Sequence, residues 1–167
     1  VPLINVLNGG AHAAHSTDMQ EFMLVPHGAP TFSEALRYGS EVFHALKKVI
    51  MGMGFGTAVG DEGGFAAPLK SNRKALDLLV ESIESAGYVP GKDVSISIDA
   101  AASEFYDGTS YELASEHKKH TVDELITLYA EWAKAYPLVS IEDGVSEKDW
   151  EGSAKLTKSL GSQLHIV

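Results

Sequence analysis

The chain has 167 residues, enough for one domain with a substantial core, and its 44% hydrophobic and 22% charged content are ordinary for a globular protein. The net charge of −10 opposes nonspecific binding to nucleic acid, and no apolar run approaches the roughly 20 residues that span a bilayer. Cysteine is absent, which excludes disulfides and thiolate metal sites and fits a reducing compartment.

The first part of the chain predicts two strands that are joined by a long loop. Residues 2–7 form an apolar run that leads into the tight turn Asn8-Gly9-Gly10, and residues 21–25 form a second run that stops at Pro26. The loop between them, Gly9 to Asp18, holds two histidines. Loops of this kind on a rigid scaffold often carry function.

Two helices are predicted next. One opens with the capping box Thr31-x-x-Glu34, and the other begins after Ser71 and ends at Gly87. Helical spacing marks their apolar positions as Phe32, Leu36, Val42, Phe43, Leu46 and Ile50 in the first helix, and Leu76, Leu79, Val80 and Ile83 in the second.

From Val94 onward strands and helices alternate. A strand over 94–99 precedes a helix that opens at Thr121-x-x-Glu124, and a strand over 138–142 precedes a helix that starts near Ser146-x-x-Asp149 and ends around Gly161. A last short strand follows at 164–167, and Lys118-Lys119 is typical of a surface hairpin or loop. This alternation predicts βα units and a parallel sheet.

Five strands without closure would leave two unpaired edges, which is a hazard for an isolated α/β domain. A (βα)₈-type barrel that is cut after its fifth strand explains the pattern better than a complete small fold. The chain also opens on Val1-Pro2 and closes on an apolar run at Val167, so we expect it to be a fragment of a longer protein.

Two of the predicted strands end abruptly on acids, at Asp99 and at Glu142-Asp143. Carboxylates at the carboxyl ends of parallel strands are where barrel enzymes keep catalytic and metal-binding groups. Two of them aimed at one place call for a cation, and hard oxygen donors favour Mg²⁺ over zinc. The alternatives are a helix N-cap or loop acid at Asp99, and a simple strand-ending turn with Gly144.

The densest motif is Gly60-Asp61-Glu62-Gly63-Gly64. Glycines on both sides let the backbone turn sharply, and the adjacent acids suit a metal ligand or a general acid; the alternative is a solvated acidic turn. His12 lies in a loop of small residues, where an imidazole either reaches a substrate or is simply exposed. The other histidines, His15 among them, are interpreted as surface residues.

Taken together, several motifs in one order resemble the enolase family, in its bacterial type. The resemblance covers essentially the whole chain and is carried by residues 1–10, 20–23, 39–44, 60–64, 102–105 and 139–143. It implies that residues 1–167 are the N-terminal part of the enolase C-terminal barrel domain, with a capping domain before them and three further βα units after them. It also implies that the second strand of the barrel runs antiparallel.

The resemblance assigns roles residue by residue. Asp99 and Glu142 match two of three carboxylates that hold Mg²⁺ in enolases, and the third would lie just beyond Val167. Glu62 matches the general acid that protonates the departing hydroxyl group. Catalytic Glu21, together with His12 and Gln20, matches residues on the substrate side; Gly144 stands where some enolases have proline.

The implied activity is the Mg²⁺-dependent dehydration of 2-phosphoglycerate to phosphoenolpyruvate in glycolysis. Because the lysine base and the third metal ligand fall outside the chain, we expect residues 1–167 alone to be inactive. Two alternatives stay open, another acid-sugar dehydratase or racemase of the superfamily, and a plasminogen-binding role at the cell surface. The resemblance further implies a homo-oligomer, and a location in the cytoplasm with possible display at the surface or secretion.

Overall fold

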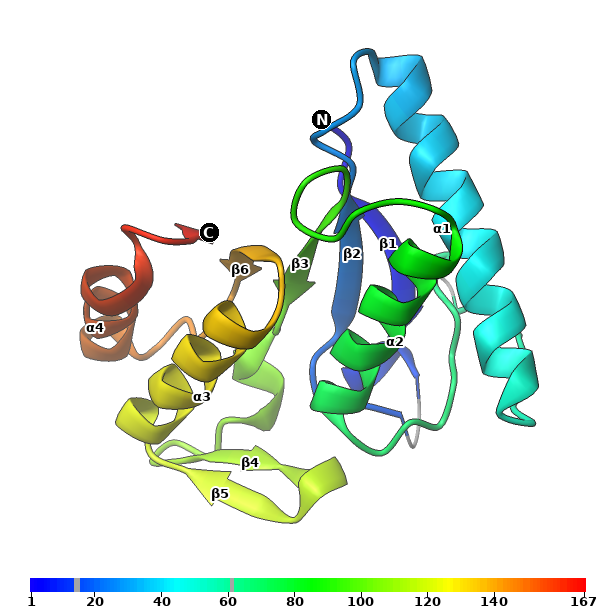
Figure 1. Ribbon diagram of the computed structural model, residues 1–167. Helices are drawn as coiled ribbons and strands as arrows, with labels where there is room; N and C mark the ends of the chain where they lie inside the picture. Colours follow the sequence, from blue (N-terminus) through cyan, green and yellow to red (C-terminus); the bar gives the residue numbers. More distant parts are fainter. Residues whose placement is uncertain (14–15, 61) are drawn as a thin grey trace.

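The computed structural model describes residues 1–13, 16–60 and 62–167. Its main element is a five-stranded sheet in the order β1-β2-β3-β6-β7 (Figure 1). The strands are β1 (Ile4–Asn8), β2 (Glu21–Val25), β3 (Ser95–Asp99), β6 (Leu138–Glu142) and β7 (His165–Ile166). All five occur where the sequence predicts them.

Strand direction follows the expectation closely. β2 runs antiparallel to both β1 and β3, whereas β3–β6 and β6–β7 are parallel pairs. The parallel sheet that the alternation predicts is therefore confirmed from β3 onward, and so is the antiparallel second strand. The sheet formed by the described residues stays open, so the barrel expected from the sequence is not seen here as a closed structure.

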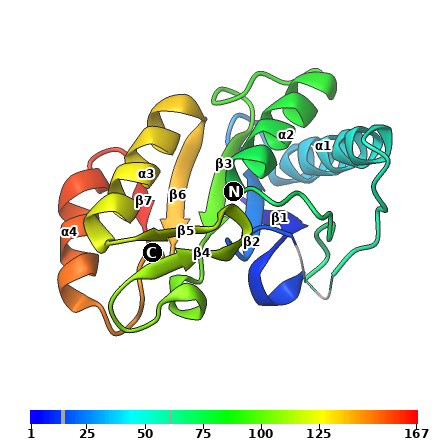
Figure 2. The same cartoon turned by 90° about the horizontal axis from the view of Figure 1, so that it is seen from below.

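Four helices, α1 (Phe32–Gly52), α2 (Asn72–Ser85), α3 (Val122–Ala135) and α4 (Trp150–Leu160), lie along one side of the curved sheet (Figure 2). A hairpin of β4 (Tyr111–Leu113) and β5 (Lys118–His120) forms a separate two-stranded sheet. The prediction of a hairpin or loop at Lys118-Lys119 is thereby confirmed as a hairpin. Short 3₁₀ turns are η1 (Gly10–His12), η2 (Ala102–Phe105) and η3 (Ala114–Glu116). None of the helices within the described ranges is long and apolar enough to cross a membrane.

The helix starts are fixed by capping side chains. Thr31 and Ser71 accept hydrogen bonds from the third backbone N–H of α1 and α2, and Thr121 forms the complete capping box with Glu124. α4 begins later than the sequence predicts. Its cap is Asp149, whose carboxylate accepts from the Gly152 N–H at 2.9 Å.

The buried face of α1 differs from the expectation at two positions. Phe32 is 64% exposed and Leu36 47% exposed, whereas Val42 and Leu46 are fully buried. Leu36 follows the buried Ala35 by one residue, which turns it about 100° away from the face that packs on the sheet. In α2, Val80 is only partly buried and packs at the edge of the core.

The two faces of the sheet have opposite chemistry. The face toward the helices is apolar and joins them in one core, to which Phe22, Leu24, Ile96, Ile98 and Ile141 contribute. The other face carries polar residues in register across β3 and β6, where the Ser97 and Ser140 hydroxyls lie 2.5 Å apart. Since strand residues alternate between faces, this pair fixes the orientation of the residues two positions further along each strand.

Candidate active site

Three acids lie side by side at one edge of the sheet. The register pairs Glu21 with Asp99 and Asp99 with Glu142, so the acids sit on three adjacent strands, at the amino end of the antiparallel β2 and at the carboxyl ends of β3 and β6. Asp99 and Glu142 follow Ser97 and Ser140 by two residues and therefore share their face. We call Glu21, Asp99 and Glu142 the acidic edge; Figure 2 shows the strands β2, β3 and β6 that carry these acids side by side.

The electrostatics of the acidic edge favour a cation. Partial burial raises the pKa of the Glu142 carboxyl group, and the negative charges of Asp99 and Asp143 raise this pKa further. Like charges held this close destabilise each other unless a proton or a positive ion lies between them. The two strand-end acids that the sequence singled out are thus brought together, as expected from parallel strands.

The backbone after each strand end is tightly constrained. Ala101 has φ 44° and Asp143 has φ 46°, both in the left-handed region that non-glycine residues seldom adopt. The Ala101 N–H donates to Asp99 Oδ1 at 2.9 Å, and the Ala102 N–H donates to the Asp143 carbonyl at 3.0 Å. These bonds hold the two strand ends together and aim the Asp99 carboxylate.

The loop between β1 and β2 closes on itself next to the acidic edge. The Gly9 N–H donates to the Gln20 carbonyl and the Gly10 N–H to the Thr17 carbonyl, each at 2.8 Å. Gly9 permits this closure, since a Cβ there would lie 1.8 Å from Thr17 Oγ1. The Gln20 N–H in turn donates to the Asp99 carbonyl at 3.1 Å, which ties this substrate-side candidate to β3.

The backbone of His12 ends the η1 turn of this loop. The side chain of His12 lies outside the described part of the chain, and so do His15 and Asp61. The substrate-side prediction for His12 and the metal-ligand alternative for Asp61 are therefore not tested by the geometry. The structure places the loop, and with it the start of β2, against the end of β3.

Glu62 lies on a different segment from the acidic edge. The Gly60–Gly64 turn precedes Phe65, which bridges to Leu7 of β1, and Gly64 packs so closely that a Cβ would lie 2.5 Å from Asn8 Oδ1. Glu62 is exposed, and its carbonyl accepts a 3.5 Å hydrogen bond from Asn5 Nδ2. This bond places the Glu62 backbone beside the second residue of β1.

The donor set fits Mg²⁺ in part. Carboxylates are the hard oxygen ligands that Mg²⁺ prefers, and Asp99 and Glu142 supply two of them from neighbouring strands. Within residues 1–13, 16–60 and 62–167, no cluster of three or more acidic or histidine side chains is arranged to hold a metal. Two carboxylates with water completing the shell are compatible with the way Mg²⁺ is commonly bound.

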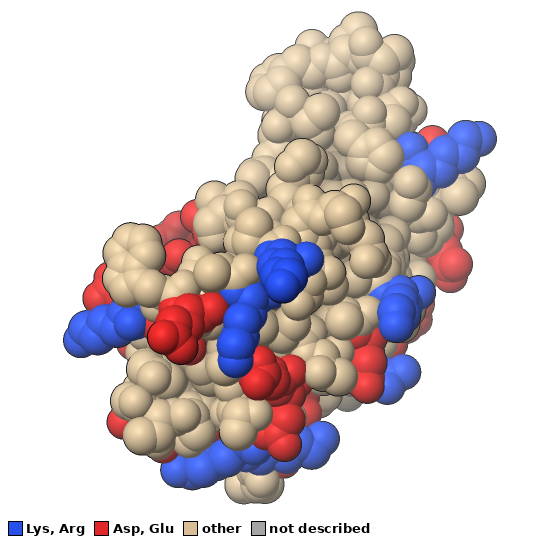
Figure 3. Space-filling view, turned by 90° about the vertical axis from the view of Figure 1, so that its left-hand side faces the viewer, with Lys and Arg blue, Asp and Glu red and all other residues tan. Residues whose placement is uncertain are grey.

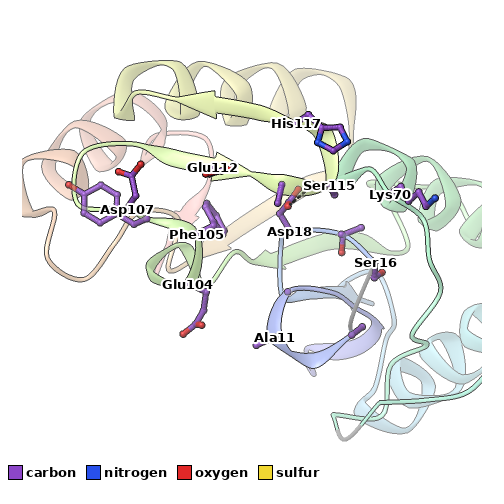
Figure 4. Close-up of a pocket in the computed structure, with 15 residues that line it drawn as sticks. Ala11, Ser16, Asp18, Lys70, Glu104, Phe105, Asp107, Glu112, Ser115 and His117 are labelled. Carbon is purple, nitrogen blue, oxygen red and sulfur yellow. Dashed lines mark hydrogen bonds between the residues drawn. The ribbon is translucent and has the colours of Figure 1, made fainter.

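A cavity of about 840 Å³ opens between the β1–β2 loop, η2 and the hairpin (Figure 4). Among its lining residues are Ala11, Asp18, Lys70, Glu104 and Ser115. Sequence reasoning marked the Gly9–Asp18 loop but missed the contacts that this loop makes with α2 and the hairpin, because Asp18, Asn72 and Ser115 carry no motif of their own. Only the fold brings these three residues, which lie far apart in the sequence, into contact.

The fold and the acidic edge define an α/β protein with carboxylates at the carboxyl ends of its parallel strands, the arrangement found in enzymes built on barrel domains. The family model described as "Enolase, C-terminal TIM barrel domain" matches residues 1–167. The chain therefore belongs to the enolase C-terminal TIM barrel family.

Proposed function

We propose that the protein containing this chain is an enolase that interconverts 2-phosphoglycerate and phosphoenolpyruvate. Membership of the enolase family supports a lyase-type enzyme. The motifs over residues 1–10, 20–23 and 60–64 resemble those of enolases, and this resemblance supports the glycolytic reaction. The single observation that carries the proposal is the 2.5 Å contact between the Ser97 and Ser140 hydroxyls, because it puts Asp99 and Glu142 on one face.

The residue types suit the chemistry. A proton next to a carboxylate is very weakly acidic, so its removal requires positive charge close to the reacting carbon. Bound Mg²⁺, held by Asp99 and Glu142, would supply that charge as a Lewis acid. Glu21 pairs with Asp99, and the N–H of the preceding Gln20 donates to the Asp99 carbonyl, so the backbones of both residues lie beside the end of β3. This neighbourhood supports a role for Glu21 and Gln20 in contacting the substrate.

Hydroxide is a poor leaving group, so an acid has to protonate it as it departs. We assign this step to Glu62. The exposed position of Glu62 leaves its carboxyl group accessible. Gly63 next to it has φ 83°, and Gly64 packs closely against β1, where a Cβ would clash. His12 completes the substrate side in this proposal.

The decisive test compares the full-length protein with its Glu62→Gln variant in a turnover assay with 2-phosphoglycerate and Mg²⁺. General acid catalysis contributes about 10²- to 10⁴-fold, so kcat should fall by at least 100-fold. Glu81→Gln, an exposed change on α2, serves as the matched control and should leave kcat unchanged. Retained turnover in Glu62→Gln would refute the acid role, and a wild type that forms no phosphoenolpyruvate would refute the whole proposal.

Assembly, location and partners are proposed on the resemblance alone: a cytoplasmic homo-oligomer that acts on a small anionic substrate rather than on nucleic acid. On the face shown in Figure 3, lysine and arginine side chains lie close to aspartate and glutamate side chains. The net charge of −10 is the basis for proposing no nucleic-acid partner.

A further inference from the structure

Asp18 lies where three segments of the chain meet. It belongs to the β1–β2 loop, and its carboxylate accepts hydrogen bonds from the Ser115 N–H at 2.9 Å and from the Ser115 hydroxyl. The same carboxylate accepts from Asn72 Nδ2 at 2.9 Å, at the start of α2. Figure 4 shows Asp18 and Ser115 facing each other at the cavity between the loop and the hairpin.

Asn72 completes the connection from the other side. It is fully buried, and its Oδ1 accepts from the backbone N–H groups of Asp18 and Met19 at 2.9 and 3.0 Å. Glu116, in η3 next to Ser115, accepts from the Asn72 N–H at 3.2 Å. A buried amide with this many partners is held in one orientation, because each lost bond would leave a polar group unpaired.

This network acts on the residues directly before β2. Asp18 and Met19 are followed by Gln20 and Glu21, the substrate-side candidates at the acidic edge. Gln20 is held on both sides by backbone bonds, to Gly9 and to Asp99. A shift of Asp18 would therefore move the loop end that leads into both candidates.

We propose that Asp18 is a positioning residue, which acts through Asn72 and Ser115 to set the placement of Gln20 and Glu21 against the substrate. Asp18 itself needs no contact with the substrate. The β4–β5 hairpin, which carries Ser115, thereby becomes part of the active-site architecture. This inference rests on the proposed function, since it concerns the same substrate side.

The test uses the full-length protein with the variants Asp18→Asn, Ser115→Ala and the two combined. Asp18→Asn keeps the shape of the side chain but replaces one accepting oxygen with a donor, which would face the Ser115 N–H in place of Oδ1 or Asn72 Nδ2 in place of Oδ2. We expect kcat/KM for 2-phosphoglycerate to fall at least tenfold, chiefly through a higher KM, with the Mg²⁺ affinity unchanged. The loss of kcat/KM in the double variant should be no larger than in Asp18→Asn alone. The two substitutions remove the same contact, so their effects on kcat/KM should not add.

Glu112→Gln is the matched control, because Glu112 lines the same cavity, lies on the same hairpin and has an exposed side chain. It removes the same charge and should leave kcat/KM within twofold of the wild type. The proposal is overturned if Asp18→Asn also stays within twofold, or if the losses of the two single variants multiply in the double variant.

Amide hydrogen exchange separates this inference from the proposed function. Asp18→Asn should speed exchange at residues 16–20 at least tenfold while exchange in α1 is unchanged, whether or not the protein acts on 2-phosphoglycerate. If the wild type shows no turnover, the proposed function fails and exchange alone decides the positioning role. Unchanged exchange at residues 16–20 overturns it.

Discussion

At the scale of single residues, the candidate site is built on strained backbone. Ala101 and Asp143 both have a left-handed φ, and they follow Asp99 and Glu142 within two positions. A non-glycine residue in this region costs about 1–2 kcal/mol, which is tolerated where the surroundings hold it in place. Here the hydrogen bonds from Ala101 to Asp99 and from Ala102 to Asp143 do so.

Ala101→Gly should separate strain from function. Glycine removes the cost of the left-handed φ but gains freedom in the unfolded chain, so the free energy of unfolding should rise by roughly 0.5 kcal/mol. Activity should stay near that of the wild type, because a glycine keeps the backbone N–H that donates to Asp99 Oδ1. Urea denaturation and a turnover assay check both effects. Ala100→Gly, at a buried residue without a left-handed φ, should instead destabilise by about 1 kcal/mol or more.

Two of the site residues that sequence reasoning identified owe their positions to strand ends, whereas Glu62 and His12 were identified in a turn and a loop. Asp99 and Glu142 close apolar runs, and parallel strands bring such ends together without further information. Asp18 and Asn72 were missed because their importance comes from a contact between distant segments. A single polar residue in a loop gives no sign of such a partner.

At the scale of elements, two buried tyrosines, Tyr111 on the hairpin and Tyr129 on α3, bind the segment between β6 and α4. The Tyr111 hydroxyl donates to Asp149 Oδ2 at 2.9 Å and accepts from the Ser146 N–H at 3.1 Å, while the Tyr129 hydroxyl donates to the Gly144 carbonyl at 3.0 Å. Asp149 thus accepts from Tyr111 with one oxygen and from the Gly152 N–H with the other, which fixes it as the N-cap of α4. Ser146, which the sequence suggested as the start, already has its N–H bound to Tyr111.

Tyr111→Phe should therefore destabilise the protein by about 2–3 kcal/mol, since it leaves the buried Ser146 N–H without a partner and removes the bond to Asp149. Tyr129→Phe removes a single bond and should cost about 1 kcal/mol. Urea unfolding of the two variants side by side gives the comparison. Equal losses would contradict the bridging role assigned to Tyr111.

Element boundaries were predictable where capping chemistry is local. Thr121 with Glu124 and the glycine after α2 act within one turn, so the sequence alone places these ends. The exposed Phe32 and Leu36 show the limit of this approach, because spacing predicts an apolar stripe but not how far the neighbouring sheet extends to cover it. Apolar spacing likewise does not tell whether the strands close into a barrel or, as in the described residues, form an open sheet.

At the scale of the whole molecule, the buried tyrosines predict sensitivity to alkali. Burial, together with Glu41, raises the pKa of Tyr88 to about 12, and burial raises the pKa of Tyr111 and of Tyr129 even further. A group whose pKa is raised on folding contributes its full stabilisation at pH values below its pKa in the unfolded chain, which is near 10 for tyrosine. This contribution is lost as the pH rises toward the pKa of the group in the folded protein.

The free energy of unfolding should thus fall as the pH rises from about 10 toward 12. Urea unfolding at a series of pH values measures this loss of unfolding free energy. Tyrosinate absorbance reports the pH at which the tyrosines ionise in the folded and in the unfolded protein. The variant Tyr129→Phe should show a shallower decline than the wild type. A decline of the same steepness in both proteins would contradict the account.

We propose that the whole protein, as an enzyme, binds Mg²⁺ through Asp99 and Glu142 together, which lie at the carboxyl ends of adjacent parallel strands. Calorimetric titration of the full-length protein with Mg²⁺ tests it most directly. Asp99→Asn and Glu142→Gln should each weaken Mg²⁺ binding at least tenfold, while Glu104→Gln, at an exposed residue nearby, should bind as the wild type does. Wild-type Mg²⁺ affinity in both Asp99→Asn and Glu142→Gln would contradict the claim.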